Sequence, residues 1–229
     1  MIEQNIAIAV DAIVFGYSSN TLNVLLIKQK YGALKNQWAL VGGFVKNNEG
    51  LQEAVNRELK EEAGIAVSYL EQLYTFGDDI KRDPRLRVVS VAYFALVKAS
   101  DFTLIADTDA DDARWFPVKD LPDLAFDHNA IIDLSLKRLQ SKLSYQPIGF
   151  DLLSSNFLFS ELENLYCTIL EKEIDRRNFR KKVLNFGFVE ETEEFAPTKS
   201  GRPAKFFRFN RKKYNELISN GFVFEIKLA

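Results

Sequence analysis

The sequence predicts an α+β fold, with a mixed β-sheet and flanking helices in the first part of the chain and a smaller domain after it. Strand-like aliphatic runs and segments of helical spacing are mixed along the first part. Residues 146–149, Gln-Pro-Ile-Gly, then interrupt regular structure, because proline and glycine so close together end helices and strands. Beyond this break the order changes to two helices and a β-hairpin. We therefore expect one domain over residues 1–146 and a second over residues 147–229.

The composition supports two modest cores and excludes several classes of protein. A chain of 229 residues with 47% hydrophobic content can fill a core in each domain. No apolar run approaches the roughly 20 residues that cross a bilayer, and no charged start precedes the apolar stretch of a secretion signal. A single cysteine excludes an internal disulfide and a zinc site built from several cysteines. We expect a cytoplasmic protein without a membrane partner.

Strands are predicted on both sides of a glycine pair. Apolar residues alternate with others over residues 6–14, and residues 24–27 form a second run after a turn-prone Ser-Ser-Asn. Residues 37–41 lead to Gly42 and Gly43, where the missing Cβ atoms permit a close approach of the backbone to a ligand. Later runs, at residues 87–98 and 113–118, complete the predicted strands of this domain.

Two helices are predicted in the first domain. Leu51, Ala54, Val55, Leu59 and Ala63 recur at spacings of three to four, and Gly64 supplies a stop. A second helix should begin near His128, with Asp127 as its N-cap, and run to about Tyr145.

The second domain should open with two capped helices. We expect Ser160 to cap a helix that ends near Leu170, and Asp175 to cap one that ends at Phe186, before Gly187. Strands at residues 188–192 and 205–209 then flank a loop that holds glycine and proline, which is typical of a β-hairpin with a long tip.

The first helix carries a cluster of carboxylates. Glu58 and Glu62 are four residues apart and share one face, and Glu61 lies on the adjoining edge. Three like charges so close together destabilise one another and favour a hard cation such as Mg²⁺, which prefers oxygen ligands and bridges carboxylates to phosphates. Such a metal can polarise a phosphoryl oxygen and generate hydroxide from bound water. Arg57, which precedes this cluster, could form a surface salt bridge with a glutamate of the same helix.

The pattern runs from Gly43 through Glu49 to Arg57-Glu58-Leu59-Lys60-Glu61-Glu62-Ala63-Gly64-Ile65, and it resembles the Nudix box of Nudix hydrolases at every fixed position. The resemblance implies that Glu58, Glu61 and Glu62 bind Mg²⁺ (or Mn²⁺), that Arg57 orients the carboxylates, and that Glu49 contributes from outside. The resemblance also implies that Glu61, Glu58 and Arg57 are catalytic residues. The substrates of such an enzyme would be nucleoside diphosphates linked to another moiety.

Ligand contacts are expected outside this helix as well. Gly42, Gly43 and Glu49 are candidates from the box region. Arg82 and Arg85, in a dense charged segment before a predicted strand, could bind phosphate, although a solvated loop is the alternative for most of that segment.

Basic residues of the second domain gather between Lys172 and Lys213. In the second predicted helix, Phe179, Val183 and Phe186 form an apolar stripe and the cations fall away from it. A short helix before it and a hairpin after it give the order of a winged helix-turn-helix, whose second helix enters the major groove. The predicted DNA-binding residues are Arg176, Arg177, Asn178, Arg180, Lys181, Lys199, Arg202 and Lys205. The alternative is a basic helix that serves dimerisation or acts as a lid.

The whole chain resembles Nudix-related transcriptional regulators, a family that includes repressors of NAD biosynthesis and of pentose utilisation. The matching segments are residues 82–85 with 87–93, 125–128, 175–181 and 201–204. This resemblance implies a Nudix-fold α/β/α sandwich with a mixed sheet, followed by a winged helix-turn-helix domain. It also implies a homodimer that binds a double-stranded DNA operator and senses ADP-ribose, another nucleotide sugar or a pentose-type sugar.

All glutamates of the box are present, whereas many regulators of this family have lost some of them. The second hypothesis is therefore a Mg²⁺-dependent diphosphatase that cleaves ADP-ribose or a related nucleoside diphosphate, alone or combined with regulation. RNA binding ranks third, because it rests on basic charge alone.

Overall fold

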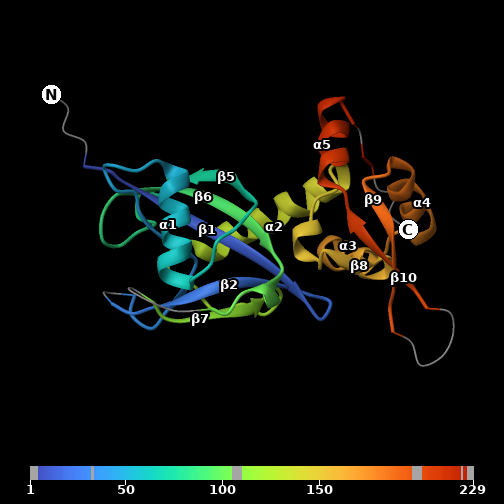
Figure 1. Cartoon of the computed structure of the whole chain (residues 1–229). Helices are drawn as coiled ribbons and strands as arrows, with labels where there is room; N and C mark the ends of the chain where they lie inside the picture. Colours follow the sequence, from blue (N-terminus) through green and yellow to red (C-terminus); the bar gives the residue numbers. More distant parts are fainter. Residues whose placement is uncertain (1–4, 32–33, 105–109, 198–202, 223, 226–229) are drawn as a thin grey trace. The chain divides into compact units, whose positions relative to one another are not determined.

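The computed structural model describes residues 5–31, 34–104, 110–197, 203–222 and 224–225. The chain divides into two compact units, Met1–Arg138 and Leu139–Ala229, and each is described by itself (Figure 1). The division falls inside one continuous helix, α2 (His128–Tyr145). The domain boundary after residue 146 stays a prediction.

The first unit is a seven-stranded sheet with helices. Its elements are β1 (Ala7–Ser18), β2 (Thr21–Gln29), β3 (Trp38–Ala39), β4 (Val41–Phe44), α1 (Leu51–Ala63), β5 (Leu70–Phe76), β6 (Val88–Val97), the 3-10 helix Ala99–Asp101, β7 (Ala110–Pro117) and the start of α2. The strand order is β3-β2-β1-β6-β5, with β4 also paired to β1 and β7 to β2. β1 and β6 run parallel and the other pairs run antiparallel, so the sheet is mixed, as predicted.

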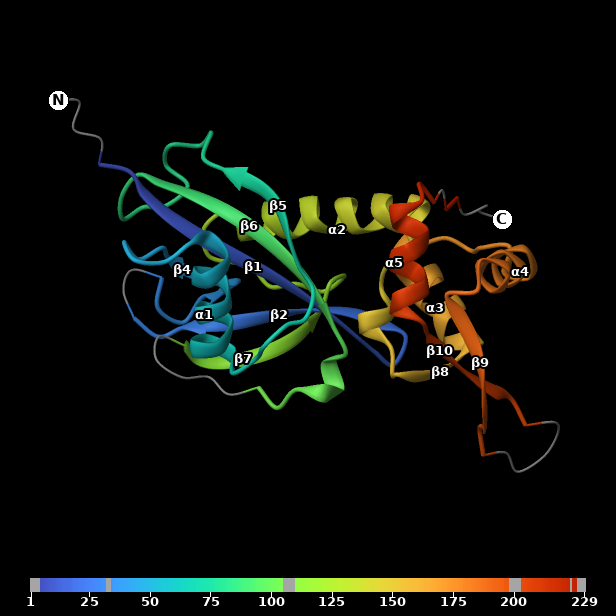
Figure 2. The same ribbon diagram turned by 45° about the horizontal axis from the view of Figure 1, so that its top comes forward.

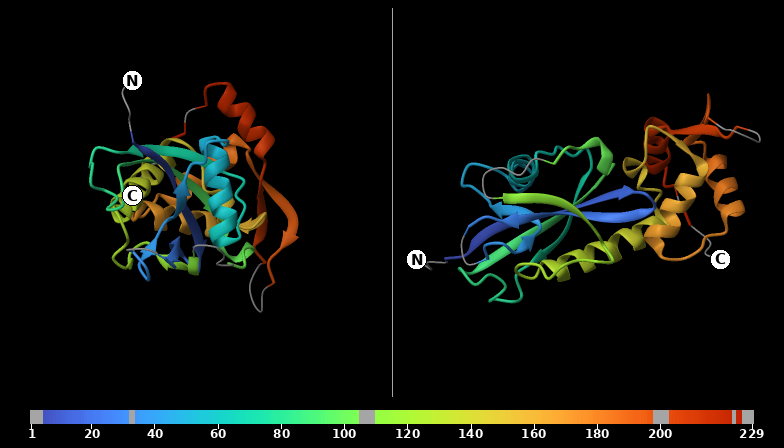
Figure 3. Two further views of the ribbon diagram at one scale, coloured as in Figure 1. Left: turned by 90° about the vertical axis from the view of Figure 1, so that its left-hand side faces the viewer. Right: turned by 90° about the horizontal axis from the view of Figure 1, so that it is seen from below.

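Helices cover both faces of this sheet. Val10, Ala12 and Val14 of β1 point to one face and join a core with residues of α1. Figure 2 shows α1 lying over the strands, and Figure 3 shows the first part of α2 on the opposite side. There Ile131 and Ile132 are fully buried. The sandwich explains why β1 is buried on both sides instead of alternating between core and solvent.

The helices of the first unit begin and end where local signals predict. α1 ends at Gly64, which adopts the left-handed conformation at φ 69° and so allows the chain to turn. α2 begins at His128 directly after Asp127. β5 was not predicted from the sequence, because it is an edge strand with a register shift between Gln72 and Tyr74 and no regular apolar alternation.

The second unit contains the end of α2, the 3-10 helix Phe150–Leu152, β8 (Asn156–Leu158), α3 (Phe159–Leu170), α4 (Arg176–Phe186), β9 (Val189–Phe195), β10 (Lys205–Phe209) and α5 (Arg211–Ser219). Its sheet has the order β8-β10-β9 and is antiparallel throughout. Aromatic rings fill its core. The ring centres of Phe159 and Phe207 lie 5.3 Å apart in an edge-to-face arrangement, and those of Phe179 and Tyr166 lie 4.8 Å apart. This is the predicted winged helix-turn-helix order, with an additional strand and helix.

The N-cap of α3 corrects a sequence prediction. Ser160 does not cap this helix; Leu158 is the N-cap residue, and its backbone N–H donates to Glu161 Oε2 at 2.6 Å. Asp175 does cap α4, by accepting from the Asn178 backbone N–H at 3.0 Å. α5 was not predicted from the sequence: it spans only nine residues, and its short apolar stripe, Tyr214, Leu217 and Ile218, contains no fully buried residue. No helix in the described part of the chain is both long and apolar enough to cross a membrane.

Candidate functional site

A pocket in the first unit collects residues from β1, β4, α1 and the loops before β6 and α2. Its lining comprises Ala9, Asp11, Gln29, Leu40, Gly42, Gly43, Phe44, Glu58, Glu62, Arg82, Asp83, Arg85, Val88, Phe126 and His128. Six of the residues singled out in the sequence are among them, namely Gly42, Gly43, Glu58, Glu62, Arg82 and Arg85. The structure thus brings the box helix and the charged loop together around one opening. Glu49, Arg57 and Glu61 lie beside this pocket on the box but do not line it.

The glycine pair lets the carboxylates approach the backbone. A Cβ atom on Gly43 would lie 2.2 Å from Glu58 Oε1, and one on Gly42 would lie 2.3 Å from the Val10 carbonyl oxygen. The Gly42 backbone N–H donates to Glu62 Oε2 at 2.9 Å. The β1 backbone therefore excludes a side chain at Gly42, and a side chain at Gly43 would have to displace the Glu58 carboxylate.

Arg57 joins three carboxylates of the box. Its guanidinium donates to both oxygens of Glu49 at 2.9 and 2.6 Å, to Glu58 at 2.7 Å and to Glu61 at 3.1 Å. The hydrogen bonds from Arg57 lower the pKa of Glu49 to about 2. Burial raises the pKa of Glu58 above its ordinary value, although Arg57 opposes the shift. Arg57 is thus a partly exposed ion-pair partner of three box carboxylates, and its role in orienting them stays a prediction.

The carboxylates offer the oxygen donors that a hard divalent cation prefers. Glu58 and Glu62 are buried and face the pocket, whereas the side chain of Glu61 is 41% exposed. Within the described ranges, no group of three or more His, Cys, Asp or Glu side chains is arranged to hold a metal ion. The donor chemistry fits Mg²⁺ or Mn²⁺: Arg57 binds one oxygen of Glu58 and one of Glu61, which leaves the second oxygen of each carboxylate as a candidate ligand.

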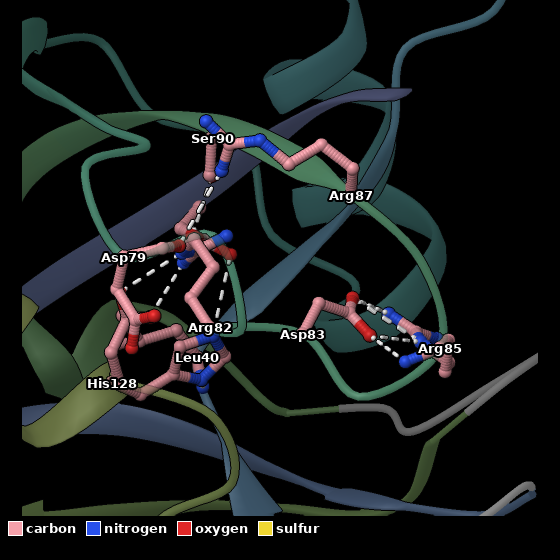
Figure 4. Close-up of polar contacts among 10 residues, drawn as sticks. Leu40, Asp79, Arg82, Asp83, Arg85, Arg87, Ser90 and His128 are labelled. Carbon is pink, nitrogen blue, oxygen red and sulfur yellow. Dashed lines mark hydrogen bonds and ion pairs between the residues drawn. The ribbon is translucent and has the colours of Figure 1, made fainter. Parts of the chain in front are cut away.

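A buried ion-pair network forms the floor of the pocket (Figure 4). Arg82, with a side chain only 4% exposed, donates to both oxygens of Asp127 at 2.9 and 2.6 Å and to Asp11 at 3.4 Å. Asp11 also accepts from the Ser90 hydroxyl at 2.6 Å. Burial alone would raise the pKa of Asp11, but contacts with His128, Ser90 and Arg82 outweigh it and lower the pKa. Arg82 is therefore a buried structural cation, and not part of a solvated loop.

His128, the only histidine of the chain, fixes the segment before the glycine pair. Its Nδ1 accepts from the Leu40 backbone N–H at 2.9 Å, so Nδ1 carries no proton and the ring proton lies on Nε2. Nε2 is 3.5 Å from Asp11 Oδ1. This contact ties the start of α2 to the segment that leads into the box, so His128 has a structural role here.

Two aromatic rings flank Arg85 at the same pocket. The Arg85 guanidinium carbon lies 5.2 Å from the centre of the Phe44 ring and 5.1 Å from that of Phe126. Phe126 has a left-handed backbone, with φ at 57°, which phenylalanine rarely adopts. Sequence reasoning missed Asp11, Phe44 and Phe126 as pocket residues. Asp11 gave a signal as a lone carboxylate inside an apolar strand, and Phe126 lies in the segment 125–128 that resembles the regulator family.

The second unit presents the predicted recognition helix α4. Phe179 and Val183 are buried, while Arg177 and Lys181 are exposed on the other side of the helix. Among the residues that the structure describes, no ion pair or side-chain hydrogen bond holds these two cations. Asn178 is half-buried and its backbone N–H is occupied by the Asp175 cap.

The other predicted DNA-binding cations have partners within the second unit. Arg176 contacts Glu163 at 3.4 Å and Asn164 at 3.1 Å, which connects α4 to α3. Arg180 lies 4.6 Å from the centre of the Phe159 ring. Lys205 pairs with Glu191 at 2.9 Å. Lys199 and Arg202 lie outside the described residues.

Family models match both parts of the chain. The model of the NUDIX domain matches residues 6–135, and that of the NrtR DNA-binding winged helix domain matches residues 149–209. An ADPR responsive transcriptional repressor NtrR of Acinetobacter baylyi is 33% identical over 90% of this chain and 83% of its own length. An ADP-ribose pyrophosphatase of Methanocaldococcus jannaschii is 41% identical over 55% of this chain and 70% of its own length.

A solved structure matches the fold along nearly the whole chain. The crystal structure of Shewanella oneidensis NrtR complexed with a 27mer DNA superposes with a TM-score of 0.79 and 28% identity, over 96% of this chain and 99% of that chain. The two family matches, the length of the similarity to a repressor and the geometry of both units agree. The chain belongs to the family of Nudix-related transcriptional regulators, in which a NUDIX domain is followed by an NrtR-type DNA-binding winged helix domain.

Proposed function

We propose that this chain is a DNA-binding transcriptional repressor that binds ADP-ribose in the pocket of its Nudix domain and releases its operator in response. The observation that carries the proposal is the presence, in one chain, of a Nudix-box pocket and a helix with two cations free to bind phosphate. Arg177 and Lys181 supply those cations, and the relatives named above supply the effector class.

The DNA-binding part of the proposal predicts different effects for different cations of α4. Arg177→Ala and Lys181→Ala should each weaken DNA binding and reduce the slope of log affinity against log salt by about 1, because each removes one phosphate contact. Arg176→Ala and Arg180→Ala should mainly destabilise the second unit, since these side chains have protein partners.

Fluorescence anisotropy with DNA from upstream of the chain's own gene, at several salt concentrations, measures this difference. Lys60→Ala is a matched control, because it removes one exposed cation from the Nudix unit. A wild-type protein without salt-sensitive, sequence-specific binding would refute the repressor proposal. Equal slopes for Lys60→Ala and Arg177→Ala would refute the assignment of α4.

The effector part is tested by adding ADP-ribose to the preformed complex. We expect release of DNA at concentrations that saturate the pocket, and Arg177→Ala should bind ADP-ribose like the wild type. Ribose and arabinose serve as comparisons, since the sequence also allows a pentose-type effector. Release by a pentose but not by ADP-ribose would replace the proposed effector.

Hydrolysis of ADP-ribose is a second candidate activity, favoured by the presence of Glu58, Glu61 and Glu62 and by the similarity to an ADP-ribose pyrophosphatase. We propose that these glutamates hold Mg²⁺ or Mn²⁺ while Arg57, which donates to both oxygens of Glu49, orients them. When bound, the metal would polarise the diphosphate and activate water.

Incubation of ADP-ribose with Mg²⁺ and either the wild type or Glu61→Gln tests this candidate. Phosphate-ester products from the wild type alone would support it, and equal inactivity of both proteins would exclude it. Isothermal titration with Mn²⁺ reports metal binding independently of turnover.

We further propose a homodimer, since paired winged helices would recognise an operator with two half-sites. Sedimentation of the free protein and of its DNA complex tests this. A single protein copy on a full operator would contradict it.

A further inference from the structure

Residues that follow α5 pack against the second half of the basic helix α4. Phe222, Phe224 and Glu225, which we call the α4 clamp, lie outside the range that the winged helix family model matches. A helix that reads DNA must be held at a fixed position, because hydrogen bonds to base edges are directional. The contacts of the clamp therefore bear on DNA recognition.

The two halves of α4 are held by different partners. Asp175 caps the first turn, and Arg176 joins this turn to Glu163 of α3. In the last turn, the ring of Phe186 contacts Phe188, which lies just before β9, and the two rings of the clamp. The second half of the helix thus depends on residues that come after the hairpin in the chain.

The clamp holds α4 through ring contacts and a hydrogen bond. The ring centre of Phe222 lies 4.5 Å from that of Phe186 in an edge-to-face arrangement, and that of Phe224 lies 6.3 Å from it. Phe224 is only 1% exposed. The Lys182 ammonium of α4 donates to the Glu225 backbone carbonyl and lies 5.9 Å from the centre of the Phe224 ring. Both an apolar and a cationic side chain of α4 are therefore fixed by the clamp.

A glycine turn at the end of α5 places the clamp. Gly221 has a left-handed backbone, with φ at 75°. Its N–H donates to the Ile218 carbonyl at 3.2 Å, and the Phe222 N–H donates to the Leu217 carbonyl at 3.1 Å. These two bonds form a Schellman motif, which ends the helix and turns the chain. No atom of the described residues lies within 4 Å of the position that a Cβ on Gly221 would take, so a side chain fits there but the backbone disfavours it.

We propose that the α4 clamp positions α4 so that its side chains can form hydrogen bonds with base edges. This inference rests on the proposed DNA binding by α4 and adds a group of positioning residues that act through this helix. Long, flexible cations such as Arg177 and Lys181 reach phosphates from a range of helix positions, whereas base contacts require one position. A displaced α4 therefore loses base contacts and keeps most of its phosphate contacts.

Paired substitutions at Gly221 test the clamp without changing a side chain that contacts α4. Gly221→Val disfavours the left-handed backbone, whereas Gly221→Asn, the matched control, tolerates it. Fluorescence anisotropy of the full-length protein compares its affinity for the operator fragment with that for a random duplex of equal length. Gly221→Val and Phe224→Ala should each lower the ratio of these affinities by about tenfold, the scale of one lost base contact. Gly221→Asn should retain the ratio of the wild type.

The ratio separates positioning from a merely structural role. Partial unfolding lowers both affinities by the same factor, because only the folded fraction binds either DNA, and so it leaves the ratio unchanged. Hydrogen exchange of the free protein gives a second readout: the amides of residues 183–186 should exchange faster in Phe224→Ala than in the wild type. If Phe224→Ala fails to fold, the two Gly221 variants still decide.

A ratio for Gly221→Val within about twofold of the wild type would overturn the clamp and keep the proposed DNA binding. Equal losses in Gly221→Val and Gly221→Asn, or unchanged exchange at residues 183–186 in a folded Phe224→Ala, would also overturn the clamp alone. A wild type that does not prefer the operator fragment over the random duplex would overturn both proposals.

Discussion

Replacing Arg82 by methionine tests whether the buried network at the pocket floor stabilises the Nudix unit. The change removes two hydrogen bonds to Asp127 and one to Asp11, and it leaves the Asp11 carboxylate buried with fewer partners. Removing one partner of a buried ion pair costs about 3–5 kcal/mol. The Asp127 side chain is 26% exposed, so water recovers part of its solvation. We therefore expect the lower end, a loss of about 3 kcal/mol in the free energy of unfolding.

Tryptophan fluorescence during urea unfolding reports on the unfolding of the first unit alone. The chain has two tryptophans, Trp38 and Trp115, and both belong to the first unit. Asp11→Asn combined with Arg82→Met should be less destabilised than Arg82→Met alone, because the double variant no longer buries an uncompensated charge. A loss below about 1 kcal/mol for Arg82→Met would refute the reasoning.

The same network predicts how the difference depends on pH. The folded pKa of Asp11 lies below its ordinary value of 3.8, so its stabilising contribution is fully present above that value and is lost as the pH falls through the folded pKa. Arg82→Met removes one cause of the lowered pKa. The difference in the free energy of unfolding between wild type and variant should therefore be full at neutral pH and should narrow once the pH falls below 3.8 towards the folded pKa. A constant gap would contradict a charge effect.

Three further predictions follow from single contacts. Gly42→Ala should destabilise the first unit by about 2 kcal/mol, because its Cβ would lie 2.3 Å from a backbone carbonyl oxygen of β1. Tryptophan fluorescence during urea unfolding measures this loss, and an unchanged free energy of unfolding would contradict the close contact. Arg57→Met should raise the pKa of Glu49 from about 2 towards its ordinary value, because the hydrogen bonds from Arg57 lower it. Carboxyl ¹³C NMR titration measures this pKa, and an unchanged value would show that Arg57 does not lower it. Asp175→Ala should lower the free energy of unfolding of the second unit by about 1 kcal/mol, because α4 loses its cap, whereas Asp175→Asn should retain it. Circular dichroism during unfolding compares the two variants, and equal losses of stability would argue against capping.

Local signals in the sequence were sufficient for most helices and for the box. Gly64 and Gly187 predict helix ends because a left-handed residue is needed there, and both have that conformation. The carboxylates of α1 share a helix face whatever surrounds them, since their spacing follows the helical repeat. The prediction for Ser160 was wrong because several side chains near a helix start can accept from its unpaired backbone N–H groups. In α3 the Glu161 carboxylate accepts from the Leu158 N–H, and Ser160 lies inside the helix.

Contacts between distant segments could not be predicted in the same way. Arg82 and Arg85 look alike in the sequence, yet one is buried between two aspartates and the other lies half-exposed between two rings. Which arginine takes which role depends on Asp127 and Phe126, which approach only after the sheet and α2 have packed.

The sequence by itself determined the carboxylate helix, the basic helix of the second domain and most of the other elements, but not β5, β8 or α5, because spacing along a helix and turn-forming residues act over a few positions. The tertiary structure decided which charges remain available. It paired Arg57 with the box glutamates, buried Arg82 and left Arg177 and Lys181 exposed. Ion pairs and ring contacts form between side chains far apart in the chain, and their partners are set by packing.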